Sequence, residues 1–199
     1  AKPLDVKAIS LLRKNGARAI TISGITPALG QIKSLNYLPN VLAKMEAERK
    51  GVYEGIFITA DGLVLEGSST NVFIVSKGVL KTPLTSILSP RGRGGKIQFM
   101  PFPYNLLSPQ GRGKGEGVVS YGILPGIMRQ AVIETARENG IKVIERGITV
   151  KELMKADEVF LTNSIIEVVP LIKIDSKPIG DGRAGSVTST PRGDNTLTG

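Results

Sequence analysis

The residues best placed to do chemistry are a carboxylate and a run of small hydroxyl residues directly before a hydrophobic strand. Glu66 is followed by a glycine and then by Ser68, Ser69 and Thr70, and residues 71–75 have the pattern of a buried strand. A carboxylate entering a core strand is costly unless a cationic group meets it. The segment therefore predicts either a functional carboxylate with a cationic partner or a tight turn with Glu66 in solvent, since such turns are commonly rich in Gly and Ser.

The composition limits which groups could perform acid–base chemistry here. The 199 residues include no His and no Cys, which removes the usual general base, the commonest metal ligand, thiolate metal sites and disulfides. Acid–base chemistry must then use Lys, Tyr, Asp or Glu. We therefore expect no metal site, and Lys33, which lies upstream of Glu66, is the candidate cationic partner.

Four ordered segments together resemble the fold-type IV (class IV) pyridoxal-phosphate aminotransferases. This group holds branched-chain aminotransferases, D-amino acid transaminases and aminodeoxychorismate lyases. The segments read QIKSLNYLPN at 31–40, EGSSTNVF at 66–73, GILPGIMR at 122–129 and ADEVFLTNS at 156–164. The resemblance extends over most of residues 17–86 and 122–182. It implies an α/β fold whose mixed, partly barrel-like sheet is accompanied by helices, as in the large domain of these enzymes, and it implies pyridoxal 5'-phosphate as the cofactor.

The resemblance implies a role for Lys33 and for each residue of the segment around Glu66. Lys33 would bind the cofactor covalently and then move the proton at the substrate α-carbon, which a desolvated lysine with a lowered pKa can do. Glu66 would face the pyridine nitrogen, Ser68, Ser69 and Thr70 would line the ring side, and Asn71 would fix the turn. The alternatives are a solvated Lys33 at a helix start, and turn chemistry alone for Thr70 and Asn71.

The cofactor phosphate is expected at the start of a helix that follows Pro125. The backbone N–H groups of Ile127 and Met128 would lie at that helix N-terminus, where the helix dipole and free donors favour an anion. Asn163 and Ser164 would complete the phosphate site. Family members more often have a hydroxyl residue where this chain has Met128.

Three further residues are placed near the ligand by the resemblance. The backbone of Ile165 and Ile166 would approach the substrate carboxylate, although core packing is the alternative for their side chains. Tyr37 follows the lysine by four residues and would border the ring, or pack as a core tyrosine. Leu29 and Gln31 stand where the family usually carries an arginine and an aspartate.

Hydrophobic periodicity and turn residues predict the elements that must position these groups. Apolar spacing of 3.6 residues favours helices, as in the apolar stripe of Leu38, Val41, Leu42 and Met45. Short apolar runs between Gly or Pro favour strands. The Asp61-Gly62 pair predicts a hairpin turn, and Thr149 with Glu152 forms a capping box that opens a short helix. We expect helices at 6–14, 36–50 and 125–139, and strands at 20–22, 55–59, 63–65, 71–75, 79–81, 142–145, 158–162 and 168–174.

The predicted large domain, residues 1–182, is interrupted at 88–121 by a segment rich in Gly, Pro and Arg. This segment contains a repeat, with LSPRGRG at 88–94 returning as LSPQGRG at 107–113. A packed core is not expected from such a composition. A flexible surface insertion, a translated repetitive element and an arginine–glycine nucleic-acid arm are alternative interpretations. We expect residues 183–199 to form a loose tail and the N-terminal small domain of family enzymes to be absent.

The predicted function is amino transfer between a small, branched-chain amino acid and a 2-oxo acid. The alternatives are an aminodeoxychorismate lyase on the same cofactor, or a partial copy of an enzyme that is impaired or not catalytic. The net charge of +9 does not by itself predict a nucleic-acid partner, because residues 89–117 carry five basic residues against one acidic residue and account for +4 of it. With no membrane-spanning run or signal peptide evident, we expect a cytoplasmic protein. Family members are usually homodimers.

Overall fold

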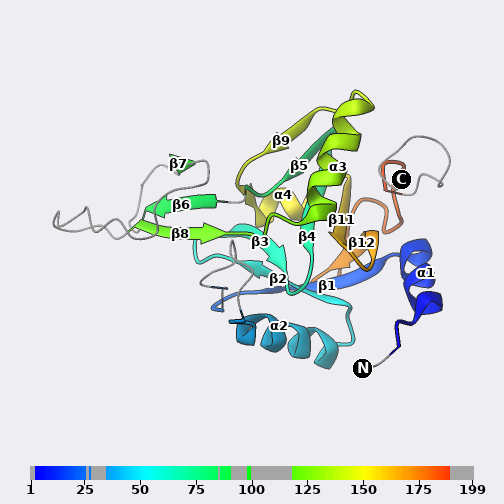
Figure 1. Cartoon of the computed structure of the whole chain (residues 1–199), viewed down its shortest axis with the longest axis horizontal. Coiled ribbons are helices and arrows are strands. Elements are labelled where there is room, and N and C mark those ends of the chain that lie inside the picture. The colour runs from blue at the N-terminus through cyan, green and yellow to red at the C-terminus, as the bar shows by residue number, and fades with distance from the viewer. Residues whose placement is uncertain are drawn as a thin grey trace.

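Most strands of the chain join in one mixed sheet in the computed structural model, which describes residues 3–25, 27, 35–84, 86–90, 98–99 and 118–188 (Figure 1). The strands of this sheet are β1 (Ala17–Ile22), β2 (Glu54–Ile58), β3 (Leu63–Gly67), β4 (Asn71–Ser76), β5 (Val79–Thr82), β9 (Val143–Glu145), β10 (Ile148–Thr149), β11 (Glu158–Asn163), β12 (Glu167–Ile174) and β13 (Lys177–Pro178). Their order is β10-β3-β2-β1-β12-β11-β4-β5-β9, with β13 beside β12. β1 runs parallel to both of its neighbours, β5 runs parallel to β9, and the other pairs are antiparallel.

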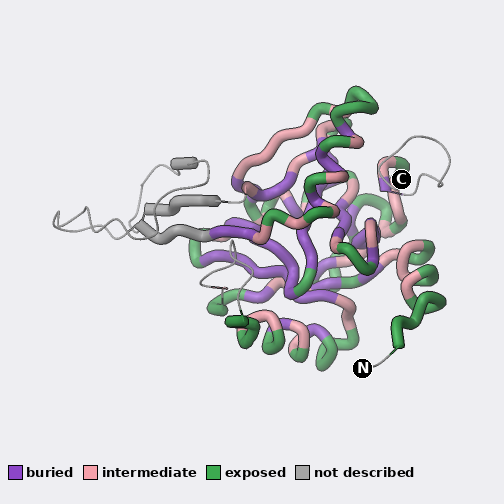
Figure 2. The backbone as a smooth tube through the Cα atoms, in the orientation of Figure 1, coloured by how far each residue is buried: buried purple, intermediate pink, exposed green. Residues whose placement is uncertain are grey.

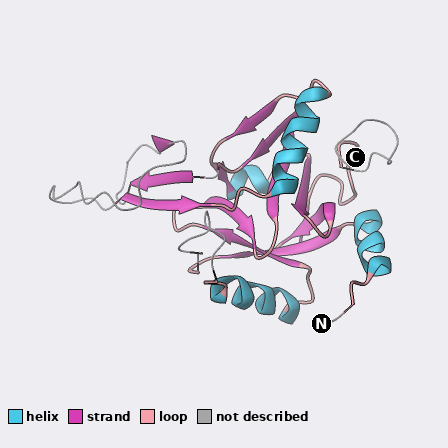
Figure 3. Ribbon diagram, viewed as in Figure 1, coloured by secondary structure: helices cyan, strands magenta, loops and turns pink. Residues whose placement is uncertain are grey.

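Four helices of the described residues are arranged around this sheet (Figure 3). They are α1 (Val6–Asn15), α2 (Leu38–Arg49), α3 (Ile127–Glu138) and α4 (Val150–Met154). The predicted capping box is confirmed, because the Thr149 hydroxyl and the Glu152 carboxylate each accept a bond from the other residue's backbone N–H. α3 begins two residues after Pro125, since Gly126 keeps an extended backbone (φ −66°, ψ 141°) and acts as the N-cap.

The central strands of the sheet are buried (Figure 2), and the consecutive buried residues of β4 show that both faces of the sheet are covered there. Val72 and Ile74 belong to the largest hydrophobic cluster, whereas Phe73 and Val75 pack with Val132 of α3 in a second cluster. Successive side chains of a strand point to opposite faces. The curled, mixed sheet with helices confirms the predicted fold class.

α2 packs against the sheet through small residues rather than through the apolar stripe that predicted it. Its buried residues are Ala43 and Ala47. A Cβ atom added at Gly55 of β2 would lie 2.9 Å from the Ala43 carbonyl oxygen, so helix and strand approach closely. The residues of the predicted stripe are exposed instead, by 41% to 65% (Leu38, Val41, Leu42 and Met45).

A separate three-stranded sheet projects to one side of the main sheet (Figure 1). It contains β6 (Ser86–Pro90), β7 (Gln98–Phe99) and β8 (Val118–Gly122). β6 and β8 pair antiparallel from Ser86↔Gly122 to Pro90↔Val118, so the two ends of the predicted insertion lie side by side. Most of residues 88–121, and residues 189–199 of the predicted tail, lie outside the described residues. Of the helices described, none has the length and apolar character needed to cross a membrane.

Candidate active site

A pocket of about 590 Å³ lies where the last residues of β3 and β11 and the first residues of β4 meet the starts of α2 and α3. Its size is within the usual range for small-molecule sites. Most of the predicted site residues line it, namely Tyr37, Glu66, Ser68, Ser69, Thr70, Asn71, Ile127, Met128, Asn163, Ser164 and Ile165. Lys33 lies outside the described residues. Other residues that line the pocket were not predicted from the sequence, namely Pro27, Asn36, Asn40, Leu124 and Thr162.

Glu66 is a buried carboxyl group with few hydrogen-bond partners. Its exposed fraction is 7%, which excludes the interpretation of a turn with Glu66 in solvent. Its Oε2 atom accepts from the Leu124 backbone N–H at 2.9 Å and from the Asn71 amide at 3.4 Å. Burial raises the pKa of Glu66 to about 8, the Leu124 N–H opposes this, and the nearby Glu54 carboxylate adds to it. No described Lys or Arg forms an ion pair with Glu66.

The three hydroxyl residues after Glu66 bind a second carboxylate, that of Glu54, which the sequence analysis missed. The Ser69 and Thr70 hydroxyls donate to Glu54 Oε2 at 3.2 and 3.0 Å, and the Ser68 hydroxyl donates to Oε1. Glu54 is 0% exposed. The only available signal was its position at the start of an otherwise apolar strand, where a carboxylate is costly.

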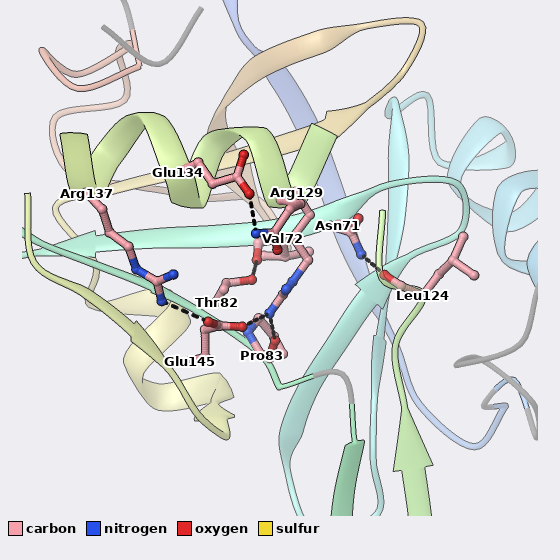
Figure 4. A network of polar contacts seen from close by, with 10 residues as sticks. Asn71, Val72, Thr82, Pro83, Leu124, Arg129, Glu134, Arg137 and Glu145 are labelled. Carbon is pink, nitrogen blue, oxygen red and sulfur yellow. Dashed lines mark hydrogen bonds and ion pairs between the residues drawn. The ribbon is translucent and has the colours of Figure 1, made fainter. Parts of the chain in front are cut away.

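Asn71 binds the segment that leads into α3 (Figure 4) and also the Glu66 carboxyl group. Its amide nitrogen donates to the Leu124 carbonyl oxygen at 2.9 Å as well as to Glu66. A Cβ atom added at Gly126 would lie 2.2 Å from Asn71 Oδ1. The Asn71 side chain therefore occupies the space that a side chain at Gly126 would need.

Replacement of Gly126 with alanine is expected to displace the Asn71 amide and to destabilise the protein by about 1–3 kcal/mol, the usual cost of overpacking. The same displacement should weaken ligand binding, because Asn71 bonds both Glu66 and Leu124. Urea denaturation of Gly126→Ala, Asn71→Ala and the double variant would measure the loss in the free energy of unfolding. When Asn71 is already alanine, the Gly126→Ala replacement should reduce this free energy much less. Strictly additive losses in the double variant would contradict the steric explanation.

The first turn of α3 lies at the pocket with its backbone donors free of any side-chain cap. Gly126 makes no side-chain capping bond, and Ile127 and Met128 line the pocket. The first N–H groups of a helix have no partner within the helix, so they are available to an anion. The arrangement is compatible with the predicted phosphate position.

Arg129 holds this helix start in place (Figure 4). It is 3% exposed, and its Nη2 atom donates to the Pro83 carbonyl oxygen and to Glu145 Oε2, both at 2.9 Å. Arg137 also pairs with Glu145, at 3.2 Å. The Arg129 side chain therefore binds β9 and the segment after β5.

The turn after β11 is organised by the side chain of Asn163. Its Oδ1 atom accepts from the N–H groups of Ile165 and Ile166 at 2.8 and 2.9 Å, and its Nδ2 atom donates to the Ser69 carbonyl oxygen at 3.0 Å. These two backbone donors, predicted to approach a substrate carboxylate, are bound to Asn163 in this structure. The Ile166 side chain is 3% exposed within the main cluster and does not line the pocket.

Two residues near the start of α2 complete the wall. Tyr37 lines the pocket and is 49% exposed, so it is not a packed core tyrosine. The Asn40 amide donates to the Ser68 carbonyl oxygen at 2.8 Å. α2 therefore contacts the same turn that Glu54 and Asn163 bind.

A curled mixed sheet with a buried carboxyl group and a helix N-terminus around one pocket is the arrangement that the resemblance implies, that of the large domain of the fold-type IV pyridoxal-phosphate enzymes. The family model of the amino-transferases of class IV matches residues 20–90 and 118–174, which is more than half of the chain. The chain belongs to this family, whose members use pyridoxal 5'-phosphate.

Individual relatives support this assignment. A Methanocaldococcus jannaschii protein assigned to the branched-chain-amino-acid aminotransferases is 36% identical over 89% of this chain and 51% of its own length. The D-alanine aminotransferase of Bacillus licheniformis is 34% identical over 88% of this chain and 50% of its own length. The crystal structure of the Escherichia coli branched-chain amino acid aminotransferase superposes with a TM-score of 0.68, at 30% identity over 90% of this chain and 49% of that one. The chain thus spans about half the length of these relatives.

Proposed function

We propose that this chain forms the cofactor-binding part of a pyridoxal 5'-phosphate-dependent aminotransferase that moves an amino group between a small amino acid and a 2-oxo acid. The observation that carries the proposal is Glu66, a buried carboxyl group at 7% exposure that lines the same pocket as the start of α3. Branched-chain amino acids are the proposed amino donors. D-Amino acids are the next candidates, because relatives of both kinds match the chain to a similar extent.

The pocket residues fit this cofactor in three respects. Glu66 has few partners for a buried carboxyl group, and a pyridine N–H would give it one. The Thr162 hydroxyl is 0% exposed, lines the pocket and has no hydrogen-bond partner among the described residues. Buried polar groups are rarely left unpaired without a ligand or water. Finally, the uncapped N-terminus of α3 suits a phosphate.

Each residue set has a distinct task in the proposed reaction. When bound, pyridoxal 5'-phosphate supplies an aldehyde that reacts with amines and a ring that withdraws electron density from the substrate α-carbon. The carboxylate of Glu66 keeps the proton of the ring nitrogen in place. Lys33 moves the proton at the substrate α-carbon. The first turn of α3, held by Arg129, orients the phosphate.

Half of the proposed reaction can be followed by absorption without a second substrate. The protein loaded with pyridoxal 5'-phosphate is mixed with L-leucine, L-isoleucine, L-valine or D-alanine, and conversion to pyridoxamine 5'-phosphate is measured by the change in spectrum. We expect conversion with the branched-chain L-amino acids and its reversal by 2-oxoglutarate. Conversion by D-alanine alone would move the assignment to D-amino acids. Formation of 4-aminobenzoate from aminodeoxychorismate, with no transfer, would favour the lyase.

A loaded protein that converts none of these amines would contradict the proposed function. The cytoplasmic location remains a prediction from the sequence, and the pairing of two copies remains a prediction from the resemblance. The division into a large domain at 1–182, an insertion at 88–121 and a tail at 183–199 is likewise proposed. The family model skips residues 91–117, which supports the insertion.

A further inference from the structure

Glu54 is a fully buried carboxylate for which the proposed reaction has no use. It is the first residue of β2 and is 0% exposed. No ion pair joins it to a Lys or Arg of the described residues. Burying a carboxylate costs several kcal/mol unless hydrogen bonds offset the loss of water. Its hydrogen-bond partners therefore indicate what this carboxylate does.

All the partners of Glu54 are donors from one short stretch of the pocket wall and from its own strand. Its Oε1 atom accepts from the backbone N–H groups of Gly55 at 3.0 Å and Ser68 at 3.1 Å, and from the Ser68 hydroxyl. Its Oε2 atom accepts from the Ser69 and Thr70 hydroxyls. An ionised carboxylate only accepts, so each of the three hydroxyl protons is directed at Glu54.

This pattern determines what the wall offers to a ligand. A hydroxyl group has one proton and two lone pairs. Because Ser68, Ser69 and Thr70 give their protons to Glu54, their oxygens can only accept from a ligand in the pocket. The start of α3 presents backbone N–H donors. The pocket thus has an accepting side at residues 68–70 and a donating side at residues 126–128.

Close packing around Glu54 holds the hydroxyl groups of residues 68–70 in this orientation. A Cβ atom added at Gly67 would lie 2.2 Å from Thr70 Oγ1 and 2.9 Å from Glu54 Cγ. The carboxylate and the hydroxyl groups therefore fill the space beneath the turn. The Ser68 carbonyl oxygen is held from the other side by the Asn40 amide.

We propose that Glu54 is a positioning residue that orients the cofactor. By accepting the protons of Ser68, Ser69 and Thr70, it leaves this wall without hydroxyl donors, so the wall disfavours the phosphate and suits the ring, whose nitrogen pairs with Glu66. The anionic end of the ligand is thereby directed to the start of α3. This inference rests on the proposed function, because it requires the cofactor as the ligand.

Replacement of Glu54 with glutamine tests the proposal. The glutamine side chain has the shape of the glutamate side chain, but its amide nitrogen donates hydrogen bonds where a carboxylate oxygen accepted them. That donation turns at least one hydroxyl proton toward the pocket. Affinities for pyridoxamine 5'-phosphate, which cannot bind Lys33 through an aldehyde, and for inorganic phosphate would be measured by calorimetry. We expect about tenfold weaker binding of pyridoxamine 5'-phosphate and unchanged binding of phosphate. Equal weakening of both would indicate general loosening and overturn the proposal.

Hydrogen exchange of the ligand-free protein supplies a measurement that does not depend on the cofactor. The Ser68 N–H donates both to Glu54 Oε1 at 3.1 Å and to the Gly55 carbonyl oxygen at 2.9 Å. Glu54→Gln weakens the first of these bonds and should accelerate exchange of the Ser68 amide, whereas the exposed control Glu138→Gln should not. Unchanged exchange at residues 67–70 would overturn the positioning role, even if the wild-type protein bound neither probe and the proposed function failed. Thr70→Val removes only the 3.0 Å hydrogen bond to Glu54 and should accelerate amide exchange to a smaller extent. This second variant keeps the test available if Glu54→Gln folds poorly.

Discussion

Replacement of Glu66 with glutamine is expected to stabilise the ligand-free protein at pH 8 while impairing its use of the cofactor. Burial raises the pKa of Glu66 to about 8 in the folded protein, whereas an unfolded glutamate titrates near 4.3. Between these values the folded state holds a proton that the unfolded state has lost. The stability of the wild-type protein should therefore fall as the pH rises through this window, by about 1.4 kcal/mol per pH unit and by on the order of 5 kcal/mol in total.

A glutamine at position 66 cannot ionise, so this pH dependence should disappear in the variant. Denaturation at pH 5 and at pH 8 would measure the difference. The half-exposed Glu46→Gln serves as the control, because the hydrogen bond to Arg49 lowers the pKa of Glu46, so that this carboxyl group does not titrate in the window. A Glu66→Gln variant with the same loss of stability from pH 5 to pH 8 as the wild type would refute the burial argument.

The same variant should lose about 100-fold or more in amino transfer. Its amide gives the ring nitrogen no anionic partner, and removal of one well-placed electrostatic group commonly has an effect of this size. The variant should still bind inorganic phosphate, because the start of α3 is unchanged. A variant with wild-type transfer rates would show that Glu66 does not face the ring.

Replacement of Lys33 with alanine is expected to abolish both the covalent attachment of pyridoxal 5'-phosphate and amino transfer. Lys33 lies outside the described residues, so its role is inferred from the residue types of the chain. A chain without His or Cys has few groups that can move a proton at an α-carbon, and an amine can both bind an aldehyde and carry that proton. The absorption band of the attached cofactor should be present in the wild type and absent in the variant.

Reductive trapping identifies the attachment site directly. After borohydride treatment, mass spectrometry should locate the added mass on the peptide that contains Lys33, and the exposed control Lys50→Ala should be labelled like the wild type. Added mass on another lysine, or a Lys33→Ala variant that keeps the band, would overturn this assignment. Absence of attachment in the wild type would instead favour a pocket that no longer works.

The sequence by itself determined the helices and the longer strands of the main sheet, together with most of the pocket lining, whereas β6, β7, β8, β10 and β13 were not predicted. The hairpin at Asp61-Gly62, the capping box of Thr149 and Glu152, and the apolar runs of β4 and β11 depend on neighbours within a few residues. The positions of Glu66 and Asn163 followed from ordered motifs, and both residues line one pocket. Such features are local, so residue types and spacing are enough to predict them.

Only the tertiary structure decided which groups bind one another. Glu54 accepts from hydroxyl groups 14 to 16 residues away, and Asn163 donates to the Ser69 carbonyl oxygen across 94 residues. α2 packs through Ala43 and Ala47 because Gly55 allows close approach, which leaves its larger apolar residues exposed. Periodicity indicates which face of an element is apolar. Strand register and the crossing of distant segments determine which partner meets a polar group, and these arise only when the sheet is assembled.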